Sequence, residues 1–176
     1  AENDSIISDE NYTYIPAKII SNSIKFSKNF ITINKGINQK IDVEDGVISK
    51  IGVIGIINNN SEKFSTLISI LNTDLKINAK VKSTNHFGSL SWDANNFQIM
   101  NLDDIPKSAL IKYGDTIQTG GMSSIFPENI PIGTIIEHSL PDASNYYEIK
   151  VKLFEDIGSV NNVYVVKNKF KQEIKD

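Results

Sequence analysis

The chain contains no cysteine and no arginine, and each absence removes a class of function. Without cysteine there is no disulfide framework, no thiol nucleophile and no cysteine-ligated metal. All 18 basic side chains are lysines, so the arginine forks that read guanine and phosphate are missing. The formal net charge of −3 gives no attraction to a polyanion. We therefore expect no nucleic-acid partner.

Long apolar runs and helical periodicity are missing as well. No stretch approaches the roughly 18 apolar residues of a membrane-spanning helix, and no basic segment followed by an apolar one marks a signal peptide. No window of about 12 residues shows a convincing 3.6-residue period. Because the first residue is Ala1 rather than methionine, we expect a fragment of a longer protein, in which a membrane anchor could precede it.

What the chain does contain is a series of short segments in which apolar and polar residues alternate. β-Branched residues dominate segments such as 14–22 and 29–35, and turn residues separate the segments at intervals of about 8–12 residues. Gly52 and Gly55 indicate a hairpin or bulges in a curved sheet. The pattern predicts an all-β fold of two small β-barrels packed against each other, with little helix. The strand residues that we expect to be buried, the last two in the core of the second barrel, are Ile31, Ile33, Val53, Ile68, Ile70, Trp92, Ile132 and Ile135.

The alternating pattern breaks into small polar residues just before Gly88, and we place a domain boundary there. The strands expected within 146–168 could complete either barrel. The lead-in is either the frayed end of a helix or disordered, and the charged C-terminal end is expected to be mobile. The expected organisation is a polar lead-in (1–11), a first β-barrel (12–84), a second β-barrel (85–168) and a mobile tail (169–176).

The segment 114–133 is where a serine nucleophile would lie. It contains Ser123 and Ser124, and the candidate bases are His86 and His138. A nucleophilic serine needs a hydrogen-bonded base and an oxyanion hole. The strand-to-helix elbow G-x-S-x-G is absent, and neither serine is followed by glycine. We therefore favour a structural corner between strands, while a double β-barrel serine hydrolase stays open as an alternative.

The acidic and aromatic residues give no stronger indication of chemistry. The histidines lack the paired spacing of a zinc site, and the adjacent acids Glu44-Asp45 and Asp103-Asp104 are expected to lie in solvated turns. Asp115 is expected to cap a turn by accepting a backbone N–H. Trp92 and Phe126 are expected to be buried anchors rather than exposed platforms. We predict no catalytic residue, no cofactor site and no metal site.

The segment KYGDTIQTGGMSSIFPENIPIG (112–133) resembles the hallmark segment of the MreC family of rod-shape-determining proteins. That family typically shows Gly-Asp, a hydrophobic strand, Thr-Ser-Gly, Phe-Pro and Pro-hydrophobic-Gly in this order. Similar motifs lie upstream, in an Asn-Lys-Gly turn (34–36), a Gly-Val-Ile-Gly hairpin (52–55) and a Gly-Ser-Leu-Ser-Trp strand (88–92), so the resemblance runs from about residue 14 to 167. The matching positions of the hallmark, to which we assign a structural role, are Gly114, Asp115, Thr119, Gly121, Phe126, Pro127, Pro131 and Gly133.

The chain departs from the family pattern at a few turns. It has Lys40-Ile41 where the family usually has Gly-Ile, Asn129 where glycine is usual, and Gly120 where serine is common. Asparagine is the residue after glycine that best tolerates positive φ, so we expect Asn129 to keep a left-handed turn. The departures affect local turns rather than the fold.

The resemblance implies a non-enzymatic scaffold of the bacterial cell-elongation machinery, which maintains cell shape by binding and organising peptidoglycan-synthesis enzymes. It implies the periplasmic domain of a bitopic inner-membrane protein that reaches the membrane only through a preceding N-terminal anchor. The implied partners are the elongation-specific penicillin-binding transpeptidase, MreD, RodA and MreB, with self-association of the full-length protein. Besides the hydrolase, a generic β-barrel ligand-binding module stays open, and it would require a deep apolar pocket.

Overall fold

The computed structural model describes residues 7–8 and 11–170. Most of the expected lead-in and most of the expected tail lie outside the described residues. The described chain is built from β-strands and one short 3-10 helix, η1 (Ile37–Gln39), which confirms the predicted all-β class. Within the same residues, no helix has the length and apolar character needed to cross a bilayer.

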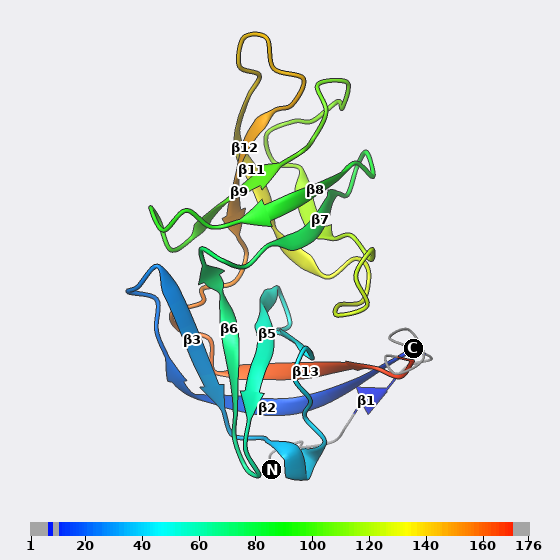
Figure 1. Ribbon diagram of the computed structural model, residues 1–176. Coiled ribbons are helices and arrows are strands. Elements are labelled where there is room, and N and C mark those ends of the chain that lie inside the picture. The colour runs from blue at the N-terminus through cyan, green and yellow to red at the C-terminus, as the bar shows by residue number, and fades with distance from the viewer. Residues whose placement is uncertain (1–6, 9–10, 171–176) are drawn as a thin grey trace.

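The first barrel is a sheet in the order β1-β2-β13-β4-β5-β6-β3, closed by pairing of β2 with β3 (Figure 1). The long strand β2 makes this closure possible because its first half pairs with β1 and β13 and its second half pairs with β3. The strands are β1 (Ile7–Ser8), β2 (Tyr12–Asn22), β3 (Lys28–Ile33), β4 (Gly46–Ile48), β5 (Val53–Asn60), β6 (Ser65–Asn72) and β13 (Asn162–Asn168).

The second barrel is closed in the order β10-β11-β12-β9-β8-β7, and every pairing in it is antiparallel. It lies above the first barrel in Figure 1. Its strands are β7 (Ile77–Val81), β8 (Phe87–Ser91), β9 (Ile99–Asp103), β10 (Thr116–Thr119), β11 (Pro131–Ser139) and β12 (Glu148–Leu153).

One strand, β7, lies in a different barrel from the one in which the boundary at 84/85 places it, whereas the barrel of the C-terminal strands was left open. β7 was expected in the first barrel, but it pairs with β8 and β10 of the second. β13 returns to the first barrel and fills the position between β2 and β4. Alternation of apolar residues reports that a segment is a strand, and it carries no information on which strand becomes its partner. The division of the chain into separate domains stays a prediction.

Most of the strand residues predicted to be buried are buried, but Ile68 is only half-buried. On β6, the alternation directs Leu67, Ser69 and Leu71 into the first barrel, and Ile68 lies on the opposite face with its ladder partner Ile56. The prediction for Ile68 is therefore wrong. Ile68 and Ile70 on the outer face of β6 are both apolar. The sequence pattern therefore does not show which face of the strand points into the barrel.

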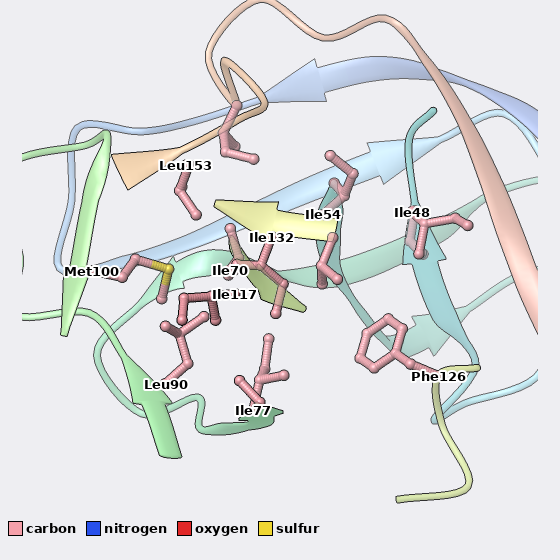
Figure 2. Close-up of a cluster of buried hydrophobic side chains, with 14 of the residues drawn as sticks. Ile48, Ile54, Ile70, Ile77, Leu90, Met100, Ile117, Phe126, Ile132 and Leu153 are labelled. Carbon is pink, nitrogen blue, oxygen red and sulfur yellow. The ribbon is translucent and has the colours of Figure 1, made fainter. Parts of the chain in front are cut away.

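Ile70 shares that outer face and is nevertheless fully buried, as is Ile54 on β5. The second barrel covers this end of the sheet. Figure 2 shows the side chains that meet there and in the adjoining core, among them Ile48, Ile54, Ile70, Ile77, Ile117, Phe126 and Ile132. The two barrels are thus joined through a continuous apolar cluster.

Candidate functional site at the junction of the two barrels

The segment 114–133 enters the junction through a tight turn. Gly114 has a positive φ of 91°, and Asp115 Oδ2 accepts the backbone N–H of Lys112 at 2.8 Å. This is the turn-capping hydrogen bond that was expected of Asp115. β10 follows and pairs with β11, whose first residue is Pro131. On β11, a Cβ at Gly133 would lie 2.2 Å from the carbonyl oxygen of Lys152, so the neighbouring strand leaves no room for a side chain.

Residues 120–130, which we call the strap, connect β10 to β11. Thr119, the last residue of β10, fastens the C-terminal part of the strap. Thr119 Oγ1 donates to the carbonyl oxygen of Pro127 at 2.6 Å and accepts the N–H of Ile130 at 2.8 Å. The strap turns at Gly121, with a φ of 81°, and at Asn129, with a φ of 72°. The expected left-handed conformation of Asn129 is therefore confirmed.

Side-chain contacts also fasten the strap to the second barrel, among them the following pairs. Gln118 Nε2 donates to Asn129 Oδ1 at 2.8 Å. Lys80 on β7, whose side chain is only 6% exposed, forms an ion pair with Glu128 of the strap. Because a buried ammonium needs a counter-charge, Lys80 fixes the place of Glu128.

Three further contacts fasten the strap to the first barrel. The Phe126 side chain is buried against Gly46 on β4, where a Cβ would lie 2.6 Å from the phenyl Cε1. The carbonyl oxygen of Phe126 accepts a hydrogen bond from Tyr12 Oη at 3.3 Å. The carbonyl oxygen of Ser124 accepts one from Asn168 Nδ2 at 3.1 Å. The strap therefore bridges the barrels, and the expectation that Phe126 is a buried anchor is confirmed.

The structure does not bring the candidate serines and histidines together. Ser123 Oγ accepts the N–H of Ile125 at 3.1 Å, and no hydrogen bond within the described ranges joins either serine hydroxyl to a histidine. The His138 ring meets Tyr147 edge-on, with 6.0 Å between ring centroids. His86 lies in the turn between β7 and β8, and its Nδ1 is buried without a hydrogen-bond partner in the structure. The four residues form no catalytic constellation as placed.

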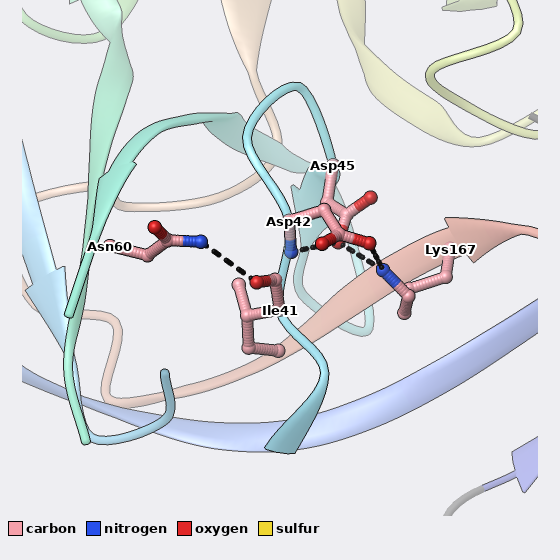
Figure 3. A network of polar contacts seen from close by, with 5 residues as sticks. All are labelled: Ile41, Asp42, Asp45, Asn60 and Lys167. Carbon is pink, nitrogen blue, oxygen red and sulfur yellow. Dashed lines mark hydrogen bonds and ion pairs between the residues drawn. The ribbon is translucent and has the colours of Figure 1, made fainter. Parts of the chain in front are cut away.

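Asp45 is not in a solvated turn, which corrects the expectation for Glu44-Asp45. Its side chain is 1% exposed, and its Oδ2 lies 2.8 Å from Nζ of Lys167 on β13 (Figure 3). Lys167 also contacts Asp42, and the N–H of Asp42 donates to Asp45 Oδ2 at 2.9 Å. The spacing Asp-x-x-Asp before a glycine signals the local turn, but the distant Lys167 leaves no local trace in the sequence. Across residues 7–8 and 11–170, no group of three or more acids and histidines is placed to hold a metal ion.

The pKa of Asp93, in the turn after β8, lies below its ordinary value. The main cause is a hydrogen bond from Asn101 Nδ2 at 2.9 Å, assisted by the backbone N–H of Asn95 and by Lys150, whose Nζ lies 3.6 Å away. All of these interactions favour the charged carboxylate. This network lies on the outer face of the second barrel, and it stabilises the turn rather than forming a reactive site.

A groove of about 690 Å³ lies where the two barrels meet, along the outer face of β2 and β13. Lys18, Lys35 and Lys50 are among its lining residues, together with Glu155. At Lys50 and Tyr164 the groove continues into a recess of about 230 Å³. The other side chains of the recess are mostly apolar: Tyr14, Ile48, Ile130 and Pro131.

The fold and the junction define a class of protein with two closed antiparallel β-barrels, joined by an apolar cluster and a strap. Each barrel is a ring of six strands, and β1 adds to β2 outside the first ring. The family model described as "Rod shape-determining protein MreC, barrel core" matches residues 19–167, and the chain belongs to this MreC family. The resemblance found in the sequence is thus confirmed.

Two relatives show the extent of the similarity. The cell shape-determining protein MreC of Listeria monocytogenes is 25% identical over 159 residues, which cover 89% of this chain and 54% of the relative. That of Bacillus subtilis is 28% identical over 168 residues, covering 89% of this chain and 58% of the relative. The chain therefore spans little more than half the length of these relatives.

Solved structures share the fold. An MreC structure from Listeria monocytogenes superposes with a TM-score of 0.82 at 24% identity, covering 95% of this chain and 80% of that one. The major periplasmic domain of the cell shape-determining filament MreC gives a TM-score of 0.75 at 20% identity, covering 93% and 100%. A chain of the complex between penicillin-binding protein PBP2 and MreC from Helicobacter pylori gives 0.71 at 20% identity, covering 90% and 99%.

Proposed function

We propose that this chain is the paired-barrel part of a non-enzymatic scaffold that maintains cell shape by binding and organising peptidoglycan-synthesis enzymes. The observation that carries the proposal is the family match over residues 19–167. The agreement of the whole paired-barrel fold with solved MreC structures supports it.

The partner that we propose first is the elongation-specific penicillin-binding transpeptidase. Its support is that a structural neighbour was solved as a complex between PBP2 and MreC. As further partners we propose MreD, RodA and MreB, with self-association of the full-length protein. We place the barrels in the periplasm, held by an N-terminal membrane anchor, because a structural neighbour is described as a major periplasmic domain.

We also propose that the hallmark residues within 114–133 have a structural rather than a catalytic role. Thr119 and Asp115 have their side-chain oxygens engaged by the backbone, and Phe126 is buried against Gly46. Ser123 accepts a local N–H. These contacts support a structural role because each side chain is already occupied in holding the strap and its flanking turns.

Titration of the purified chain with the ectodomain of its cognate elongation-specific transpeptidase tests the scaffold proposal. We expect a saturable heat signal in calorimetry, and no signal with a division-specific transpeptidase of the same organism as the matched control. If the chain does not bind the cognate ectodomain, the proposed partnership is wrong.

A separate measurement tests the non-enzymatic part of the proposal. The chain and its Ser123→Ala/Ser124→Ala variant are incubated with a fluorogenic peptide library and with casein. We expect no turnover by either protein. Hydrolysis by the parent chain that disappears in the double variant would establish the serine hydrolase alternative.

A further inference from the structure

The groove at the junction has a charge opposite in sign to that of the chain as a whole. The formal net charge of the chain is −3, yet among the residues that the structure describes the groove is lined by Lys18, Lys35 and Lys50 and by one acid, Glu155. Glu155 Oε2 accepts a hydrogen bond from Ser49 Oγ at 2.5 Å, so this carboxylate is held in the wall. In the part of the chain that the structure describes, Lys35 and Lys50 form no ion pair. The groove therefore suits a ligand that carries negative charge.

The recess at one end of the groove suits an apolar group on the same ligand. Tyr14 and Tyr164 contribute aromatic surface from neighbouring strands, and Ile130 and Pro131 face them from the second barrel. Aromatic and aliphatic side chains in a concave recess are typical anchoring points for an apolar side chain of a partner. A purely anionic polymer would leave this recess unused.

The strands that floor the groove are paired with each other. β2 and β13 pair over residues 12–18 and 162–168, and β4 pairs with the other side of β13 at residues 164–166. Because these edges are occupied, we assign recognition at this place to side chains. The volume of about 690 Å³ is in the range of pockets that bury a drug-sized ligand.

We propose that this groove binds an extended polypeptide segment of a partner protein, in which an apolar anchor residue lies beside a run of acidic residues. The apolar anchor occupies the recess between Tyr164 and Pro131, and the carboxylates lie along Lys50, Lys35 and Lys18. The site goes beyond the transpeptidase partnership proposed above and does not depend on it.

Fluorescence anisotropy with a labelled peptide tests the proposal. The probe is a short fluorescein-labelled peptide with two central leucines and glutamates on both sides, and it is titrated with the full chain at low ionic strength. We expect saturable binding that weakens as salt is added, because exposed charge pairs are screened. The double reversal Lys35→Glu/Lys50→Glu is expected to weaken binding by about tenfold or more. Tyr164→Ser is expected to weaken it through loss of the recess.

Lys82→Glu is the matched control, because Lys82 is exposed in the turn between β7 and β8 and lies outside the groove. It should bind the probe as the parent chain does, and circular dichroism melts verify that every variant is folded. A probe with lysines in place of the glutamates, and one with serines in place of the leucines, should each bind more weakly.

Absence of saturable binding by the parent chain, or equal weakening by Lys82→Glu, would overturn the proposal. Equal affinity for the serine-substituted probe, or tighter binding of heparin, would replace it by a site for anionic polymers. Titration of the same variants with the transpeptidase ectodomain separates the two proposals. A failed ectodomain titration leaves the peptide result standing, and a failed peptide titration leaves the scaffold proposal standing.

Discussion

At the scale of single residues, the Lys167 ammonium neutralises a carboxylate that has almost no contact with water. The Asp45 side chain is 1% exposed and that of Lys167 is 21% exposed, and the two charged atoms lie 2.8 Å apart. A buried carboxylate that loses its counter-ion keeps the cost of its desolvation. The pair also joins β13 to the loop before β4, two parts of the chain that are far apart in sequence.

Lys167→Met is therefore expected to lower the free energy of unfolding by about 3 kcal/mol. The matched control is Lys28→Met, which breaks an exposed pair with Asp74 and should cost less than about 1 kcal/mol. Urea denaturation followed by tryptophan fluorescence measures both. Equal losses for the two variants would contradict the role assigned to the buried pair.

Asp93 makes stability depend on pH, with a defined sign. The pKa of its carboxyl is held below its ordinary value mainly by the Asn101 amide, so the unfolded chain takes up a proton at a higher pH than the native chain does. The stabilisation is fully present above the pKa of an unfolded aspartate, about 3.9, and is lost as the pH falls through the lower native value.

Carbon NMR of the Asp93 carboxyl should therefore show a midpoint below that of an unstructured aspartate. Asn101→Ala removes the largest cause and should raise the pKa toward its ordinary value. Urea midpoints of the parent chain and of Asp93→Asn should differ most above about pH 4 and converge in more acidic solution. A midpoint that does not move in Asn101→Ala would refute the assignment of the cause.

Several residue roles could be predicted because they depend on local chemistry. Trp92 is buried and its Nε1 donates to the carbonyl oxygen of Asn96 at 2.8 Å, as an aromatic anchor beside a turn should. Asp115 and Asn129 follow from turn chemistry in the same way. Asp45 and Ile68 could not be predicted, because their burial is decided by segments that are distant in sequence.

At the scale of elements, the strap has little regular secondary structure, but it makes many contacts with both barrels. Phe126 is its main apolar anchor, and the ring occupies the space that a side chain at Gly46 would take. A Cβ there would lie within 3.0 Å of the phenyl ring and of the Ile125 carbonyl oxygen. Position 46 therefore needs glycine because of close approach, and the two residues act as a matched pair.

Phe126→Ala is expected to lower the free energy of unfolding by about 3–5 kcal/mol because it leaves a cavity at the junction. Met122→Ala, in the same strap but 71% exposed, should change it by no more than about 0.5 kcal/mol. Gly46→Ala should destabilise the parent chain and cost less when Phe126 is already alanine. Additive losses in this double-mutant cycle, measured by urea denaturation, would show that the two residues do not share one space.

The strands themselves could be read from the alternation of apolar residues, but their partners could not. β7 crosses to the second barrel after a connection of only a few residues, whereas β13 returns to the first barrel after the whole second barrel has formed. Pairing is selected by which edges remain open once the other strands are in place. The groove could not be predicted for the same reason, because its walls come from β2, β13, the β4–β5 turn and the end of the strap.

At the scale of the whole molecule, the mutual orientation of the barrels determines the shape of the junction. The apolar cluster, the strap and the Ser49–Glu155 hydrogen bond hold the two barrels together at different places. The recess at the end of the groove has one wall from the first barrel and another from Ile130 and Pro131, so the width of the recess depends on that orientation. Because a surface that is fixed before binding lowers the cost of ordering it, a rigid junction would favour the binding of a partner.

The absence of cysteine in the chain allows this rigidity to be measured directly. Lys63→Cys in the first barrel and Lys107→Cys in the second are both exposed sites for spin labels. Double electron–electron resonance should give a single narrow distance distribution in the parent background. In the Phe126→Ala background the distribution should broaden, because the strap loses its anchor on the first barrel, whereas Met122→Ala should leave it unchanged. If Phe126→Ala stays folded by circular dichroism and its distribution stays as narrow as that of the parent, the apolar cluster alone sets the orientation and the strap has no part in it.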